Sequence, residues 1–183
     1  GADVTMGARG MGLDKRIGPS FLRAGIGFGG FCFPKDLEAF YWISKQKGYD
    51  FSLLKAVSDV NDSQRAWVQR QVESELRNLS GKKVGILGLA FKPHTDDLRF
   101  APSLDIIKTL QAHGVAVTVH DPVAMEKAKK LLKGVRFAKD AYDCAKGVDA
   151  LVLVTEWPEY KEMDLPLVAR ADPPDPGSPF LIT

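Results

Sequence analysis

The stretch KKVGILGLAF, residues 82–91, decides the fold. It is a continuous apolar run bounded by lysines, which is typical of a strand buried on both faces of a parallel sheet. Two further runs of this kind occupy residues 115–122 and 150–157. Helical patterns separate the runs, at 103–114, 124–134 and 140–149. Strands that alternate with helices predict an α/β domain with a doubly wound parallel sheet over residues 81–171, and ligands of such sheets bind beyond the carboxyl ends of the strands.

Residues 1–80 instead indicate a helical region. Apolar spacing predicts a short helix over 1–12, a helix over 34–46 that Pro34 opens, and a long helix over 51–79 without Gly or Pro. The apolar stripe of the long helix is compatible with the core of one subunit, or with contact to a twin in a second subunit. We expect the second arrangement, a homodimer that forms through the long helix.

Composition excludes several classes of protein. The net charge of +2 comes from 25 basic and 23 acidic residues that are mixed along the 183-residue chain, so we expect no nucleic acid partner. No apolar run approaches the roughly 20 residues that span a bilayer, and we expect no membrane partner. The two cysteines lie far apart and the three histidines lack ligand spacing, which argues against a disulfide scaffold or a metal site and favours a cytoplasmic location.

The two ends of the sequence carry separate expectations. The chain starts without Met, and we expect it to be a piece of a longer protein. Near the other end, ADPPDPGSPFLIT has four prolines within seven residues and no periodicity. We therefore expect residues 172–183 to form an irregular tail.

The segment GIGFGGFCFPKD, residues 25–36, concentrates the residues with chemical potential. Cys32 should lie near the amino end of a helix, where the helix dipole and Lys35 favour the thiolate, the nucleophilic form of cysteine. The glycines let backbone approach a ligand closely. Asp36, four residues after Cys32, is placed to hold a water or a proton. The alternatives are a buried, unreactive cysteine and an acid that stabilises the first helical turn.

A second candidate site follows the strand at 82–91. Gly85 and Gly88 form only an incomplete dinucleotide fingerprint. Lys92 and Arg99 place two cations beyond the strand's carboxyl end, where they would bind phosphate or remain solvated surface. Cys144, within a helical pattern, is expected to be a packing residue.

Two long motifs, RIGPSFLRAGIGFGGFCFPKD at 16–36 and GLAFKPHTDDLRFAPSLDII at 88–107, resemble the UDP-glucose/GDP-mannose dehydrogenase family of NAD-dependent nucleotide-sugar dehydrogenases. The resemblance covers residues 1–171. It implies an amino-terminal NAD-binding domain, a central dimer-forming helical domain and a Rossmann-like domain that binds the nucleotide sugar. This chain would hold the last two, as a central region with the catalytic cysteine loop at 1–80 and the sugar-binding domain at 81–171.

The resemblance also assigns roles to residues. Cys32 would be the catalytic nucleophile, and Asp36 would activate water or relay protons. Lys35 and Arg99 would contact NAD. Arg16 would reach into the neighbouring subunit's substrate site. The remaining substrate-binding residues would be Phe21, Leu22, Arg23, Ala24, Gly25, Gly29, Phe91 and Lys92.

The implied reaction is the oxidation of UDP-glucose to UDP-glucuronate, in two hydride transfers to NAD, for polysaccharide biosynthesis. The aldehyde from the first oxidation would add Cys32, the second oxidation would give a thioester, and water would release the acid. The family's catalytic lysine and asparagine lie ahead of this chain's start, so we expect the chain alone to be inactive. Two other readings stay open: a dehydrogenase of another nucleotide sugar such as GDP-mannose, and a non-catalytic module for dimerisation and nucleotide-sugar binding.

Overall fold

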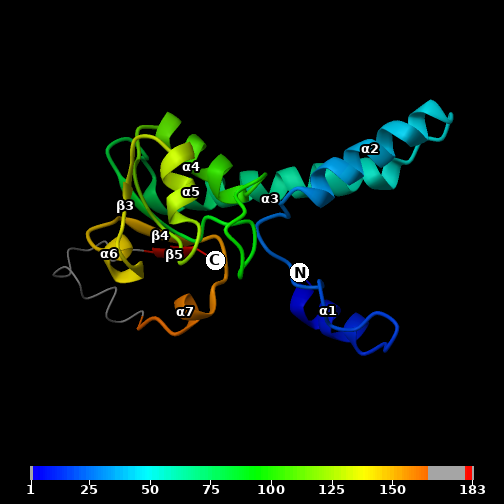
Figure 1. Ribbon diagram of the computed structural model, residues 1–183, viewed down its shortest axis with the longest axis horizontal. Helices are drawn as coiled ribbons and strands as arrows, with labels where there is room; N and C mark the ends of the chain where they lie inside the picture. The colour runs from blue at the N-terminus through cyan, green and yellow to red at the C-terminus, as the bar shows by residue number, and fades with distance from the viewer. Residues whose placement is uncertain (1, 165–179, 183) are drawn as a thin grey trace.

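The computed structural model describes residues 2–164 and 180–182, which form a helical arm and an α/β unit (Figure 1). The arm begins with α1 (Val4–Gly12), which lies apart from the sheet. It continues with α2 (Cys32–Gln46) and the long α3 (Ser52–Leu76), and α2 runs beside the outer part of α3. The inner part of α3 reaches the α/β unit and packs against α4 (Pro102–Ala112).

The α/β unit is built on a parallel sheet with the strand order β3-β2-β1-β4-β5. Its strands are β1 (Lys83–Leu87), β2 (Ala116–His120), β3 (Val135–Phe137), β4 (Ala150–Leu153) and β5 (Phe180–Ile182). The central strand β1 pairs on both sides, with Ile86 opposite Val119 and Val152, and all three side chains are buried. The predicted α/β fold with a doubly wound parallel sheet is therefore confirmed.

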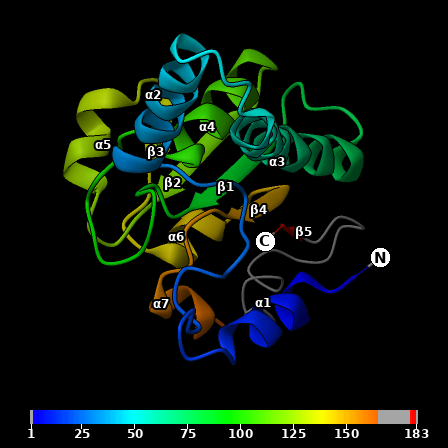
Figure 2. The ribbon, with the colours of Figure 1, turned by 90° about the vertical axis from the view of Figure 1, so that its right-hand side faces the viewer.

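Helices cover both faces of this sheet. Figure 2 shows α4 and α5 (Met125–Leu131) on one face, and α6 (Ala141–Ala145) on the other. The short α7 (Pro158–Lys161) follows β4. Crossovers on opposite faces arise because the chain builds outward from β1 through β2 to β3, and then returns to place β4 on the other side of β1.

The long helix is confirmed, with bounds Ser52–Leu76 instead of 51–79. It ends at Arg77, whose φ of 57° departs from the helical value. Val68 and Val72, in its inner half, are completely buried, whereas Leu53 and Val60 in its outer half stay mostly exposed. This exposed stripe fits the expected dimer interface, and the homodimer remains a prediction.

The expectation of an irregular tail is wrong at residues 180–182. These residues form β5, which pairs in parallel with β4 over three positions. Strand pairing stabilises them through backbone hydrogen bonds to a distant segment, which the local composition does not indicate. Residues 165–179, which hold the four prolines, lie outside the described part of the chain.

The described residues, 2–164 and 180–182, contain neither a candidate membrane span nor a candidate metal cluster. No helix there combines the length and apolar character needed to cross a membrane. In the same residues, no group of three or more His, Cys, Asp or Glu side chains is arranged to hold a metal ion.

Candidate functional site

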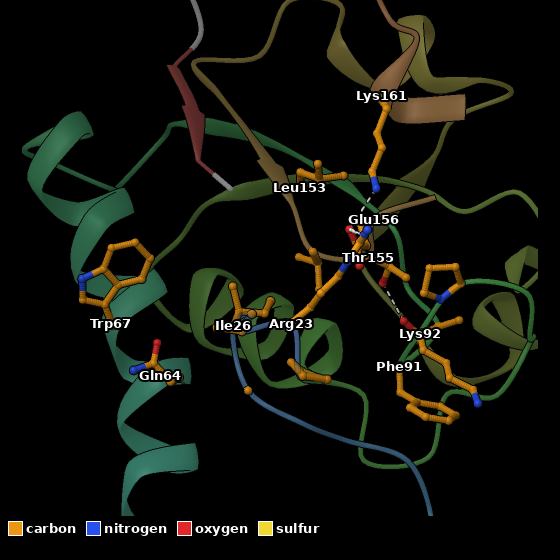
Figure 3. Close-up of a pocket in the computed structure, with 17 residues that line it drawn as sticks. Arg23, Ile26, Gln64, Trp67, Phe91, Lys92, Leu153, Thr155, Glu156 and Lys161 are labelled. Carbon is orange, nitrogen blue, oxygen red and sulfur yellow. Dashed lines mark hydrogen bonds and ion pairs between the residues drawn. The ribbon is translucent and has the colours of Figure 1, made fainter. Parts of the chain in front are cut away.

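A cavity of about 540 Å³ lies beyond the carboxyl ends of β1 and β4, where the strand order reverses direction. This is the position at which doubly wound sheets bind ligands. We call it the strand-edge cavity (Figure 3). Its walls come from the loop before α2, from α3, from the loops after β1 and β4, and from α7. The lining residues are Arg23 to Gly27, Gln64, Trp67, Ala90 to Pro93, Pro102, Leu153 to Glu156 and Lys161.

A second cavity, of about 580 Å³, adjoins the first and contains Cys32. We call it the Cys32 cavity. Arg23, Phe91, Lys92 and Glu156 line both cavities. An extended ligand would therefore pass from the sheet edge to the thiol along these four residues.

The glycine loop that leads to Cys32 rests directly on the loop between β1 and α4. A Cβ on Gly29 would stand 2.2 Å from the carbonyl oxygen of Phe100, and a Cβ on Gly30 would stand 2.7 Å from the Phe91 ring. Gly30 also has φ of 81° and donates its N–H to the Arg99 carbonyl oxygen at 3.0 Å. Side chains cannot occupy these positions, so glycine is required for the two loops to meet.

Helix α3 holds the same loop from the other side. Asn61 accepts the N–H of Phe28 at 2.7 Å and donates its amide to the Phe28 carbonyl oxygen at 3.2 Å. Arg65 donates to that oxygen as well, at 3.2 Å. Sequence reasoning missed Asn61. The available signal was a polar residue in line with Val57 and Val68 on the apolar stripe of the helix. In the structure Asn61 is buried, with an exposed fraction of 8%.

Cys32 is the first residue of α2, which begins two residues earlier than predicted. Its thiol is free and the residue is exposed, so the alternative of a buried cysteine is wrong here. A thiol at the amino end of a 15-residue helix faces unpaired N–H groups and the positive end of the dipole. Cys144 contrasts with it, since burial raises the pKa of that thiol to about 12. The prediction that Cys144 is a packing residue is consistent with its complete burial.

Two cations flank the entrance to α2. The Arg99 guanidinium lies 4.5 Å from the centroid of the Phe31 ring, and the Lys35 ammonium lies 5.3 Å from it. The Arg99 pKa is raised, mainly by the hydrogen bonds to Asp97 and in smaller part by the charge of Cys32. The exposed cations beside the Cys32 thiol suit an anionic group of a ligand.

Asp36, which was expected to hold a water or a proton, pairs with a neighbouring lysine. Its carboxylate forms an ion pair with Lys35, which raises the pKa of that lysine. Asp36 and Lys35 are absent from the residues that line the two cavities. Cys32 and Asp36 are nonetheless four residues apart on one helix, which places them on the same face.

The predicted substrate residues divide between the cavities. Arg23, Phe91 and Lys92 line both, as described above. Ala24 and Gly25 line the strand-edge cavity. Phe21, which has φ of 63° and is 93% exposed, lines the Cys32 cavity together with Gly29.

Leu22 and Arg16 line neither of these cavities. Leu22 is half-buried. The Arg16 guanidinium is exposed and pairs with Asp14 at 2.8 Å. The expected role of Arg16 in a neighbouring subunit is untested in a single chain and stays a prediction.

Sequence reasoning also missed Glu156, which organises the cations of the strand-edge cavity. One of its carboxylate oxygens accepts from Arg23 at 3.1 Å and from Lys161 at 3.0 Å (Figure 3). The hydrogen bond from Lys161 is the main reason that the pKa of Glu156 lies below its ordinary value. Its position just beyond the carboxyl end of β4, within the run at 150–157, was the signal that could have marked it.

An aromatic and an amide side chain on α3 complete this cavity. Figure 3 shows Trp67 and Gln64 on α3, across the cavity from Arg23, Lys92 and Glu156. The cavity thus has an aromatic and polar wall on the α3 side, and a cationic wall near β1 and β4. This division suits a molecule with a flat ring at one end and phosphates at the other.

Comparisons with known proteins give the chain its relatives. Residues 1–63 match the central domain of the UDP-glucose/GDP-mannose dehydrogenase family, and residues 85–174 match the UDP binding domain of that family. Bacillus subtilis UDP-glucose 6-dehydrogenase TuaD is 46% identical over 166 residues, which cover 90% of this chain and 36% of that protein. Pseudomonas aeruginosa UDP-glucose 6-dehydrogenase is 43% identical over 171 residues, covering 90% and 38%.

A solved structure shows the same similarity. The UDP-glucose dehydrogenase of Pyrobaculum islandicum superimposes with a TM-score of 0.84 at 40% identity, over 90% of this chain and 38% of that one. The chain thus spans between 36% and 38% of the length of these three relatives.

Proposed function

Since the chain belongs to the UDP-glucose/GDP-mannose dehydrogenase family, we propose that it is the substrate-binding and nucleophile-bearing part of an NAD-dependent UDP-glucose 6-dehydrogenase. One observation carries the proposal: an exposed thiol at a helix amino end opens into a cavity that shares four lining residues with the strand-edge cavity. A nucleotide sugar suits this arrangement, because its nucleotide can occupy the strand-edge cavity while its sugar reaches the thiol.

We assign the nucleotide to the strand-edge cavity. Lys92 and Arg23 face both cavities, and they would hold the diphosphate through charge-assisted hydrogen bonds. The base would lie toward Trp67 and Gln64. The sugar would then extend past Phe91 toward Cys32.

We assign the chemistry to Cys32. Its thiolate would add to the C6 aldehyde of the sugar to give a thiohemiacetal. Loss of a hydride and a proton from this adduct would give a thioester, which water would hydrolyse to the acid with release of the thiol. Asp36, on the same helix face, would hold that water or relay its proton. NAD, when bound, supplies the hydride acceptor. Lys35 and Arg99 would hold its anionic part beside Phe31.

The remaining assignments follow from the family. Residues 1–80 would serve as the central dimer-forming region and residues 81–171 as the UDP-sugar domain. The product, UDP-glucuronate, would feed polysaccharide biosynthesis in the cytoplasm. The family also includes GDP-mannose dehydrogenases, so a GDP-sugar is the second candidate substrate. We expect a homodimer formed by the exposed stripe of α3.

The test is to supply NAD with UDP-glucose to the protein joined to an amino-terminal NAD-binding domain, and to follow NADH formation. We expect two NADH per UDP-glucose and the acid as product. GDP-mannose serves as the competing substrate. Absence of NADH with UDP-glucose would overturn the proposal, and NADH with GDP-mannose alone would move it to the second candidate.

A further inference from the structure

Asp121 is a buried carboxylate at the carboxyl end of β2, with an exposed fraction of 1%. It accepts five hydrogen bonds. One oxygen accepts from the backbone N–H groups of Val123 at 2.9 Å and Ala124 at 2.7 Å. The other accepts from Leu89 at 2.7 Å, Ala90 at 3.0 Å and the Trp157 indole at 3.1 Å.

These five donors come from the loops that follow three neighbouring strands. Leu89 and Ala90 directly precede the substrate residues Phe91 and Lys92. Trp157 directly follows Glu156. The carboxylate therefore connects the segment that carries Lys92 with the segment that carries Glu156, and both segments line the strand-edge cavity.

Further contacts join the same two segments. The Thr155 hydroxyl donates to the Ala90 carbonyl oxygen at 2.6 Å. Gly88, with φ of 90°, lies so close that a Cβ there would stand 2.4 Å from the Cβ of Thr155. The spacing between the loops is thus fixed by hydrogen bonds and close backbone packing, with Asp121 at the centre.

Only a carboxylate satisfies this arrangement. An amide of the same shape would turn an NH₂ group toward backbone N–H donors, and leave buried donors without acceptors. Burial alone would raise the pKa of Asp121, but the N–H groups of Ala124, Leu89, Ala90 and Val123 outweigh it and hold the pKa below its ordinary value. In a dinucleotide-binding sheet, an acid near the end of the second strand binds the ribose. Both Asp121 oxygens are instead occupied by protein donors.

We propose that Asp121 is a positioning residue for the nucleotide-sugar site, which sets the distance between Lys92 and Glu156 without touching the ligand. The inference rests on the proposed function, because it takes UDP as the ligand of the strand-edge cavity. It predicts that UDP affinity depends on a buried group with no ligand contact.

The test is calorimetry of UDP binding to the chain and to Asp121→Asn. We expect the variant to bind UDP about tenfold more weakly or worse, because the Lys92 loop loses its anchor. The matched control is Asp149→Asn. Asp149 also accepts a backbone N–H, from Lys83 at 2.7 Å, but at the opposite end of β1. Its replacement should destabilise the fold while UDP affinity stays unchanged.

A double-mutant cycle separates positioning from general destabilisation. If Asp121 acts through Lys92, then Asp121→Asn should have little further effect on UDP affinity in a Lys92→Ala background. Independent losses that add in the double variant would overturn the proposal. Equal UDP affinity in the wild type and Asp121→Asn would overturn it as well.

If Asp121→Asn does not fold, a second variant tests the same positioning role. Thr155→Val removes the hydroxyl bond to the same loop and keeps the side-chain shape, and we expect several-fold weaker UDP binding. Unchanged affinity in a folded Thr155→Val would then overturn the positioning role. If the wild type itself binds no UDP, the proposed function fails and the inference falls with it.

Discussion

The contact between the glycine loop and the β1–α4 loop predicts a large effect of Gly29→Ala. The new Cβ would stand 2.2 Å from the Phe100 carbonyl oxygen and 3.0 Å from the Pro102 ring. Ordinary contact begins near 3.4 Å, so the loops must separate by about 1 Å, and overpacking of this kind costs about 1–3 kcal/mol. For a chain of this size, such a loss lowers the melting temperature by roughly 2–12 °C.

The functional consequence should exceed the loss of stability. Separation of the loops moves Cys32 away from Lys92, and a misplacement of about 1 Å can cost about a hundredfold in rate. Circular dichroism melts and UDP calorimetry measure stability and binding in the chain, and NADH formation measures the rate in the complete enzyme.

The control for stability is Gly25→Ala in the same loop. Its Cβ would meet no atom within 4 Å, and Gly25 does not have positive φ. The free energy of unfolding should stay the same or rise slightly in this control. A Gly29→Ala variant as stable and active as the wild type would refute the close packing of the two loops.

Four further predictions concern the thiols and the acidic groups. Iodoacetamide at about pH 8 should modify Cys32 and spare Cys144, whose buried thiol has a pKa of about 12; mass spectrometry of the alkylated peptides would contradict this if Cys144 reacted first. In the complete enzyme, Cys32→Ser should form no acid from UDP-glucose, and acid formation at the full rate would remove Cys32 from the mechanism. Glu156→Gln should bind UDP about three- to tenfold more tightly, because the carboxylate of Glu156 competes with the diphosphate for Arg23 and Lys161. Weaker binding of UDP by this variant, measured by calorimetry, would contradict the competing role of Glu156. The pKa of Asp121 is lowered in the folded chain, so its carboxylate contributes stability above the unfolded pKa of about 3.9, and this contribution is lost as the pH falls through the folded pKa. The free energy of unfolding, measured with urea across this pH range, should therefore fall less steeply in Asp121→Asn than in the wild type. An identical pH dependence of the two proteins would contradict this.

The central strands could be predicted from sequence because burial leaves a local signal. Strands β1, β2 and β4 are continuous apolar runs, and the helices between them have clear periodicity. Strand β3 spans only Val135–Phe137, with a charged residue at its centre, and gives no comparable run. Strand β5 depends on pairing with β4, which is distant in sequence.

The site residues likewise divide into those with a local sequence signal and those that depend on distant contacts. Cys32 could be identified from its own neighbourhood, since glycines, a proline and a lysine surround it within a few residues. The Asn61 bonds to Phe28 and the Glu156 bond to Arg23 join positions 33 and 133 residues apart. A local pattern can mark one residue of such a pair, but its partner is set by tertiary structure and cannot be read from the sequence nearby.

The measurement that tests the central claim most directly is calorimetry of UDP binding to the chain, to Lys92→Ala and to Arg99→Ala. We expect the wild type to bind UDP, and Lys92→Ala to lose about tenfold to a hundredfold in affinity, because a charge-assisted hydrogen bond to the diphosphate is removed. Arg99→Ala, which alters the cation beside Phe31, should leave UDP affinity nearly unchanged. No binding by the wild type, or an equal loss in both variants, would contradict the assignment of the strand-edge cavity to the nucleotide sugar.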